Sequence, residues 1–364
     1  MKNPVSIAKN SYNKILKIDD LIWQLQQINK QQILLEKKIN TLTELLAQSV
    51  QDSNDNFNKI NNLVLNSLAI DSLRFNALYK KPNESSIDTN KRFFDKIPLA
   101  DGDLRVFQKG NTKLLKQFIE ICKKHKLTYF LQSGTLLGAV RHQGFVPWDD
   151  DTDVAMFRED IKKLKKILDS DKDYRLTIVY DFFVLSRQIR FRTRDDNNPC
   201  FLDIYIYDYG SSATEKDWQK WHENKNKIIK DLWENHPSII KEWEKTPLAD
   251  SNSKLGKKLS PLFTKYYDSL IPKNINKQNY SAICWGLDNF PVKWNRLFDK
   301  DFIFPTVQLK FEKIDVQAPH KYLDYLKRQY GDIYKLPNDL ATHYQHISQS
   351  SIDIKAINKY LKEE

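Results

Sequence analysis

The sequence has little cysteine. Its three cysteines, Cys122, Cys200 and Cys284, are odd in number and lie far apart in a chain of 364 residues. A disulfide framework needs an even set of cysteines, and a zinc site of the Cys-x-x-Cys type needs closely spaced ones. The sequence therefore excludes both, and a reducing compartment suits these thiols best.

Long apolar segments are also missing. No run of about 18 apolar residues occurs anywhere in the chain. Residues 1–10 contain Lys2 and Lys9 but no apolar core of the length found in signal peptides. We therefore expect a chain that neither spans a membrane nor carries an export signal. No internal repeat is visible either.

What the chain does contain is ample material for a folded core, with 40% hydrophobic and 12% aromatic residues. At about 150 residues per domain, its length predicts two or three domains. Lys and Arg number 58 against 47 Asp and Glu, a net charge of +11 that is spread along the chain. Such an excess favours an anionic partner, which could be nucleic acid, a membrane surface or a phosphorylated substrate.

Apolar residues recur over residues 18–46 with the alternating spacing of four and three that is typical of a coiled coil. The seam consists of Leu21, Leu25, Ile28, Gln32, Leu35, Ile39, Leu42 and Leu46. Because a single polar residue such as Gln32 at a seam position often fixes register or helix number, we predict a homo-oligomer. The alternative is an amphipathic helix that packs on its own domain, since Leu34 and Leu45 widen the apolar face.

The pattern then changes twice before the main domain. Residues 51–62 are rich in Asn, Asp and Gln and predict a break, residues 63–79 predict a second helix, and residues 81–86 predict a linker. We place the domain boundary near residue 90. Residues 1–90 are then a helical coiled-coil or oligomerisation segment with its linker, and residues 91–364 form one folded domain.

Helix and strand patterns alternate beyond that boundary. Asn111 is expected to cap a helix, further helices are expected at 136–140 and 159–168, and strands at 128–131, 152–157, 174–180, 183–194 and 201–207. Residues 211–280 are rich in Lys and Trp and predict a helical insertion, in which the tryptophans pack between helices rather than stack on bases or sugars. The predicted fold class is α/β (α+β), a mixed sheet with a helical insertion behind an N-terminal helical segment.

The most informative segment is acidic. Residues 149–153 hold four carboxylates in five positions, and such a group repels itself unless a cation neutralises it. In an extended chain Asp149, Asp151 and Asp153 project from one face, while Thr152 and Val154 project toward a core. Carboxylates with no soft ligand beside them favour a hard cation, Mg²⁺ or Mn²⁺. A solvated acidic turn is the alternative.

A second acidic position lies in an apolar strand. Asp203 stands between Leu202 and Ile204, where a lone carboxylate is costly unless it meets a cation. We predict that Asp203 is a further metal ligand or a general base. The alternative is a buried ion pair with Arg190 or Arg192 on the preceding strand.

Upstream of the acidic segment lies a turn that suits phosphate. Ser133, Gly134 and Thr135 can present backbone N–H groups and hydroxyls to a phosphate at the start of a helix. Arg141 and His142, at the end of that helix, could neutralise phosphate charge or be plain loop residues. Together with the acidic strand, the turn predicts a metal-dependent nucleotide site.

These residues resemble a known family. The segment from Leu131 to Val154 is similar to the signature of the LicD family, phosphotransferases with a nucleotidyltransferase-like fold that include bacterial phosphocholine transferases and, more distantly, the fukutin-related protein. Leu202-Asp203-Ile204-Tyr205 resembles the second acidic strand of that family, and Phe304-Pro305, Tyr330-Gly331-Asp332 and Leu336-Pro337 resemble its C-terminal segment. The resemblance covers residues 105–346, and Thr152 stands where an aliphatic residue is usual.

The resemblance implies an enzyme. It would move a substituted phosphate, phosphocholine first of all, from a CDP-activated donor to a hydroxyl of a cell-surface glycan of the lipopolysaccharide, capsule or teichoic-acid type, with release of CMP. Residues 91–364 would be the catalytic domain. Asp149, Asp151, Asp153 and Asp203 would hold Mg²⁺ or Mn²⁺ and act in catalysis, and Ser133, Gly134, Thr135, Arg141 and His142 would bind the donor.

Several alternatives stay open at this point. CDP-ribitol or CDP-glycerol could replace CDP-choline as the donor, and a choline group would need an aromatic cage, for which Trp148, Tyr205, Tyr207 and Trp285 are candidates. A sugar-nucleotide glycosyltransferase with an Asp-x-Asp motif, or an oligomerising binding protein with a degenerate site, would share some of these features. We expect no nucleic-acid partner, and a cytoplasmic protein that associates peripherally with the inner face of the membrane.

Overall fold

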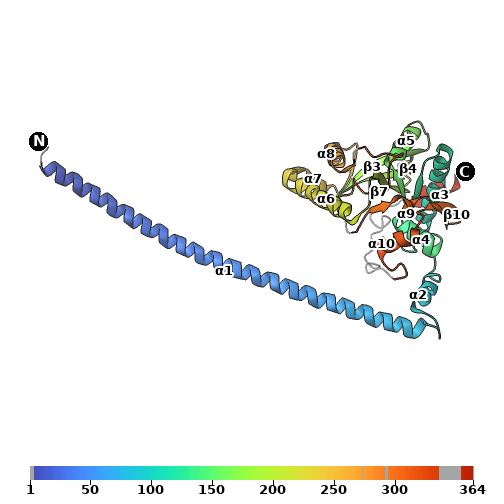
Figure 1. The fold of residues 1–364 in the computed structure, drawn as a ribbon, viewed down its shortest axis with the longest axis horizontal. Coiled ribbons are helices and arrows are strands. Elements are labelled where there is room, and N and C mark those ends of the chain that lie inside the picture. The colour runs from blue at the N-terminus through green and yellow to red at the C-terminus, as the bar shows by residue number, and fades with distance from the viewer. Residues whose placement is uncertain (1–3, 273, 292–293, 336–353, 364) are drawn as a thin grey trace. The chain divides into compact units, whose positions relative to one another are not determined.

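The computed structural model describes residues 4–272, 274–291, 294–335 and 354–363, and the chain divides into two compact units, Met1–Glu84 and Ser85–Glu364 (Figure 1). The first unit is a single long helix, α1 (Pro4–Tyr79). The second holds the sheet and the shorter helices. Leu336-Pro337, which belongs to the predicted family resemblance, lies outside the described residues.

Helix α1 runs without interruption, so the break predicted at residues 51–62 and the separate helix at 63–79 are wrong. The polar residues of this stretch lie on an exposed helix, where they reduce stability only slightly because no Pro or Gly is among them. They also support one another along the helix. Gln48 donates to Asp52 at 2.9 Å, and Gln51 donates to Asp55 at 3.1 Å, both four residues apart.

The predicted coiled-coil seam lies along α1. Among its members, the side chains of Gln32, Leu35, Ile39, Leu42 and Leu46 are exposed. Leu21, Leu25 and Ile28 lie outside the residues whose side chains are described. A row of exposed leucines and isoleucines along one helix is typical of a surface that packs against another helix. Association through residues 18–46 stays a prediction.

The second unit is built on a mixed sheet. Its strands are β1 (Tyr129–Leu131), β2 (Asp153–Phe157), β3 (Tyr174–Asp181), β4 (Ser186–Thr193), β5 (Leu202–Gly210), β6 (Leu248–Asp250), β7 (Ala282–Trp285) and β8 (Leu297–Asp299). They follow the order β1-β2-β5-β4-β3-β6, and β7 pairs with the far half of β5 and with β8. Strands β2 and β5 are parallel, whereas the other neighbours are antiparallel. A separate hairpin is formed by β9 (Val307–Phe311) and β10 (Ile314–Ala318).

Helices pack around this sheet (Figure 1). They are α2 (Ser86–Phe94), α3 (Gly102–His125), α4 (Ser133–His142), α5 (Arg158–Asp169), α6 (Glu215–Asn235), α7 (Pro237–Lys245), α8 (Lys254–Leu270), α9 (Lys300–Ile303), α10 (Tyr322–Tyr330) and α12 (Ile354–Lys362). Phe118, Phe130, Met156 and Phe191 are buried in the main core. The predicted fold class, a mixed α/β sheet with a helical insertion behind an N-terminal helix, is confirmed.

Residues 211–280 form α6, α7 and α8, with the short β6 joined to the edge of the sheet at β3. Helix α6 begins with a capping box in which Thr214 and Asp217 satisfy each other's backbone N–H groups. These helices enclose a second core with Trp221 and Trp243 inside it, and the indole of Trp243 donates to the carbonyl of Tyr180 at 3.0 Å. These two tryptophans therefore pack inside the protein.

Candidate active site

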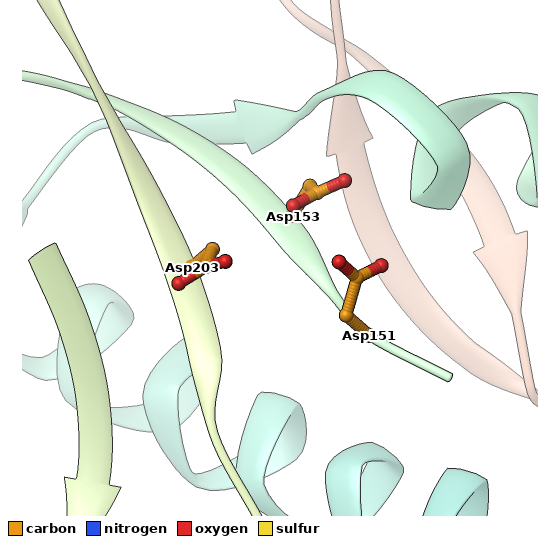
Figure 2. A group of neighbouring side chains, drawn as sticks. All are labelled: Asp151, Asp153 and Asp203. Carbon is orange, nitrogen blue, oxygen red and sulfur yellow. The ribbon is translucent and has the colours of Figure 1, made fainter. Parts of the chain in front are cut away.

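Two carboxylates meet because two parallel strands start at the same level. Asp153 opens β2, Asp203 is the second residue of β5, and the register of the two strands places them directly side by side. Asp151 lies two residues before Asp153. Oxygen atoms of the three carboxylates, called the acidic triad below, lie within 4.8 Å of one another (Figure 2).

A cation from the next strand also reaches this group. Arg190 of β4 lies opposite Asp203 in the sheet, and its Nε donates to Asp203 Oδ1 at 2.8 Å. Asp203 is therefore paired with an arginine and also belongs to the acidic triad, and its role as a metal ligand or general base stays a prediction. Arg192, the other predicted partner, donates instead to the carbonyl of Asn198.

The triad has more negative charge than its surroundings balance. Burial, and then the charges of the neighbouring carboxylates, raise the pKa values of Asp151 and Asp153 well above their usual range. Asp153 is 3% exposed, and its Oδ1 is buried with no hydrogen-bond partner among the described residues. An unpartnered buried carboxylate oxygen among converging oxygens fits a hard divalent cation such as Mg²⁺ or Mn²⁺.

The turn at Ser133–Thr135 holds Asp153 in place. The N–H of Gly134 donates to the Asp153 carboxylate, and the Thr135 hydroxyl accepts from the Asp153 N–H at 2.7 Å. Ser133 adopts a left-handed φ of 47°, accepts a hydrogen bond from Gln329 and lines a cavity beside the triad. The predicted phosphate turn therefore contacts a carboxylate of the acidic triad, and Ser133 lines the cavity; phosphate binding by this turn stays a prediction.

Asp149 lies outside the acidic triad. It follows a turn in which its N–H donates to the carbonyl of Val146 at 2.9 Å, and β2 begins only at Asp153. Its carboxylate lies over Gly134, where any Cβ would clash with Asp149 Oδ2. The charge of Asp149 contributes to the raised pKa values of Asp151 and Asp153, so it belongs to the same electrostatic group.

Arg141 and His142 lie at the far end of α4, about 12 Å of helix beyond Ser133 at 1.5 Å per residue. Arg141 is buried, stacks on Phe94 at 4.2 Å and donates to the carbonyl of Ile333 and to His142 Nε2. Burial, followed by the charge of Arg141, lowers the pKa of His142 to about 4. A neutral His142 brings no positive charge to a phosphate, and donor binding by this pair stays a prediction.

Helix α3 contributes polar residues that the sequence pattern did not reveal. The prediction of Asn111 as a helix cap is wrong, because α3 begins at Gly102 and Asn111 lies buried in its middle. Its side chain donates to the carbonyl of Asp150 at 2.8 Å and accepts from the N–H of Phe201 at 3.1 Å. Gln108, one turn earlier, donates to the carbonyl of Asp149 at 2.8 Å. The sequence contains one signal for this role: the amide residue Asn111 falls on the apolar face of a helix, where a polar side chain needs a partner.

A second support comes from the β9–β10 hairpin. Glu312 forms a two-pronged ion pair with Arg105 of α3 at 3.0 and 2.7 Å, and its N–H donates to the carbonyl of Gln143. The loop between α4 and the acidic segment is therefore clamped from two sides. Local sequence patterns do not reveal this contact, because its partners are 207 residues apart.

Comparison with known proteins agrees with this geometry. Residues 126–244 match the family model described as LicD/FKTN/FKRP, nucleotidyltransferase domain. This span includes the acidic triad and the turn that supports it. This part of the chain is therefore similar to the nucleotidyltransferase domain of the LicD family. The match also includes the start of the helical insertion, and it is shorter than the resemblance predicted from the motifs.

Individual relatives extend the comparison. The chain is 27% identical over 263 residues to the lipopolysaccharide cholinephosphotransferase LicD of Haemophilus influenzae. The aligned region covers 66% of this chain and 94% of that protein. It is 42% identical over 91 residues to an uncharacterized protein of Rickettsia prowazekii, covering 23% of this chain and 34% of that protein. With the family match, the LicD relative supports the prediction of an enzyme that transfers phosphate-containing groups.

One structural finding bears on membranes. Within the described part of the chain, every helix is too short or too polar to cross a lipid bilayer.

Proposed function

We propose that this protein transfers phosphocholine from CDP-choline to a hydroxyl of a cell-surface glycan, with lipopolysaccharide as the first candidate acceptor. The observation that carries the proposal is the acidic triad, which lies within the segment similar to the LicD family and has an unpartnered buried oxygen on Asp153. The named activity of the Haemophilus influenzae relative supports the choice of donor group and acceptor.

The chemistry is a displacement at phosphorus. The acceptor hydroxyl oxygen forms a bond to the choline-bearing phosphorus, the bond from that phosphorus to the bridging oxygen breaks, and CMP leaves with the bonding electron pair. A carboxylate takes the hydroxyl proton, either Asp203 or one of Asp149, Asp151 and Asp153. Asp151, Asp153 and Asp203 would hold Mg²⁺ or Mn²⁺, whose charge, when bound, offsets that of the diphosphate and the leaving CMP.

The surroundings of the triad are organised for this role. Arg190 fixes the orientation of Asp203, and Gly134 and Thr135 fix that of Asp153. Preorganised groups do not have to reorient during the reaction, which lowers the barrier. We also propose that the protein works at the inner face of the cytoplasmic membrane, since its diffuse net charge of +11 suits anionic glycans and headgroups.

A donor screen tests the proposal. Full-length protein is incubated with lipopolysaccharide, Mg²⁺ or Mn²⁺, and one of CDP-choline, CDP-ribitol, CDP-glycerol or a UDP-sugar, and released nucleotide is measured. We expect CMP from CDP-choline, no release with chelator, and at least about a 100-fold loss in Asp153→Asn. Asp169→Asn, an exposed carboxylate outside the triad, is the matched control and should retain full activity.

Three results would count against the assignment. Turnover of a UDP-sugar without CMP release from any CDP donor would favour a glycosyltransferase. CMP release from CDP-ribitol or CDP-glycerol alone would keep the reaction class and change the donor. Loss of activity in both variants would mean that the loss in Asp153→Asn does not come from the triad.

A further inference from the structure

A cavity of about 260 Å³ opens directly beside the acidic triad. Asp203 of the triad and Ser133 line it. It is also lined by Trp285, residues of the turn at 286–289, Arg296, and Arg187 of β4. A donor whose diphosphate lies at the triad would therefore extend one of its two ends into this cavity.

The turn at residues 286–289 is held from behind by a buried lysine. The N–H of Asn289 donates to the carbonyl of Gly286 at 3.0 Å, and Gly286 has a φ of 83°, a conformation that favours glycine. Lys225 of α6 is fully buried, and its Nζ donates to the carbonyls of both Gly286 and Asn289. Burying a lysine opposes folding, so the helical insertion supplies an unusual residue to fix this turn.

The turn presents a carboxylate with one oxygen unused. Asp288 is 2% exposed, and its Oδ2 accepts from Arg158 at 2.7 Å and from Arg187 at 2.9 Å. Its Oδ1 has no hydrogen-bond partner in the part of the chain that the structure describes. The two arginines thus orient the Asp288 carboxylate, and its Oδ1 is left without a partner in the described part of the chain, at a residue that lines the cavity.

The same wall has guanidinium donors and aromatic surface. Arg296 lies 4.1 Å from the centre of the Trp285 ring, and it donates to the Asn289 side chain at 2.9 Å. Its Nε is buried and lacks a partner among the residues described. Because Arg296 already covers a face of Trp285, and Arg187 adds a second positive charge, this cavity is a poor cage for a quaternary ammonium group.

A neutral planar ring with both donors and acceptors fits better. Cytosine has an exocyclic amino group that donates and N3 and O2 atoms that accept, whereas uracil has a carbonyl oxygen in place of that amino group. A carboxylate accepts from the cytosine amino group, and an arginine donates to ring acceptors. A carboxylate that faces the uracil carbonyl instead would leave two acceptors opposed.

We propose that this cavity binds the cytosine base of the donor, with Asp288 accepting from its amino group and Arg296 donating to its ring acceptors. This inference rests on the proposed function, because it takes the donor to be a CDP compound whose diphosphate lies at the triad. It assigns the choice of nucleotide to the turn at residues 286–289, and it places the choline end of the donor away from the cavity.

Binding of CMP and UMP to the full-length protein, measured by calorimetry with Mg²⁺ present, tests the proposal. We expect CMP to bind at least about 10-fold more tightly than UMP, because Asp288 accepts from the cytosine amino group but opposes the uracil carbonyl. In Asp288→Asn the CMP affinity should fall at least about 10-fold and the preference should disappear, because an amide can donate to the uracil carbonyl. Asp299→Asn, an exposed carboxylate outside the cavity wall, should bind like the parent protein.

A second variant separates loss of binding from loss of folding, which is needed because Asp288 belongs to a buried group of ion pairs. Arg296→Lys keeps the charge but loses the planar donor pair, and it should weaken CMP binding at least about 10-fold with an unchanged circular dichroism spectrum. Equal binding of CMP and UMP by the parent protein, or a preference that survives in both variants, would overturn the base pocket.

The two proposals fail separately. Release of CMP from CDP-choline together with equal CMP and UMP binding would remove the base pocket and keep the phosphotransferase. A clear CMP preference without turnover of any CDP donor would keep the nucleotide pocket and remove the phosphotransferase.

Discussion

At the scale of single residues, His142 shows how burial controls a charge. Its Nε2 accepts from Arg141 Nε at 2.9 Å, which requires the neutral ring. Burial and the adjacent arginine lower the pKa of His142 from 6.5 to about 4. The unfolded chain therefore binds a proton between pH 6.5 and 4 that the folded chain does not.

From this difference we predict a stability that depends on pH. The free energy of unfolding should be highest above pH 6.5 and should fall as the pH decreases toward 4, because the unfolded chain then binds a proton at His142 and the folded chain does not. At pH 5 the loss should be about 1 kcal/mol once solvent screening is included. In His142→Gln the amide can still accept from Arg141 but does not titrate. Melting temperatures at pH 7 and pH 5 should differ by about 2–4 °C less in the variant than in the parent protein. An identical pH dependence of the two proteins would show that His142 does not titrate in this way.

Residue patterns predicted the acids but not their neighbours. Alternation in the segment 149–153 and the apolar flanks of Asp203 were enough to single out both acidic positions. That Asp153 and Asp203 lie side by side depends on the parallel pairing of β2 with β5, which joins strands about 50 residues apart. Local spacing contains no information on such a register, and the same is true of Gln108 and Asn111, which contact the acidic segment only through the fold.

At the scale of elements, the continuity of α1 changes the meaning of its apolar pattern. Since no break occurs, the spacing of the seam continues in phase past residue 46 to Ile60, Leu63 and Ile70, which are 61%, 70% and 48% exposed. Between these stretches the seam positions are Ser49, Ser53 and Asn56. The composition of residues 51–62 suggested a break, because Asn and Asp are common in loops. A long helix nevertheless tolerates these residues when apolar helical turns lie on both sides of them.

We therefore predict that α1 associates with a second copy of itself. Full-length protein should show a mass of at least twice 43.1 kDa by light scattering, and Leu35→Lys with Leu42→Lys should return it to 43.1 kDa because charges at two seam positions oppose burial. Glu44→Lys, on the outer side of the helix, is the matched control and should keep the larger mass. A parent protein of 43.1 kDa would show that the exposed seam does not mediate self-association.

At the scale of the whole molecule, a protein of net charge +11 has its best-defined site in a group of acids. The excess of Lys and Arg does not neutralise this group, because within the described residues only Arg190 forms an ion pair with the triad. Like charges buried together oppose folding. A cation that binds the folded chain and not the unfolded one removes this penalty, so ion binding and stability are linked.

That linkage predicts how metal changes the melting temperature. An ion at about 100 times its Kd adds about 2.7 kcal/mol to the free energy of unfolding, so Mn²⁺ or Mg²⁺ should raise the melting temperature of the full-length protein by several degrees. Asp153→Asn should lose this increase, while its metal-free melting temperature should not fall below that of the parent, because the substitution removes one of the repelling charges. Asp169→Asn should keep the increase, since its carboxylate pairs with Lys165 at the surface. An equal increase in all three proteins would place the ion at another site.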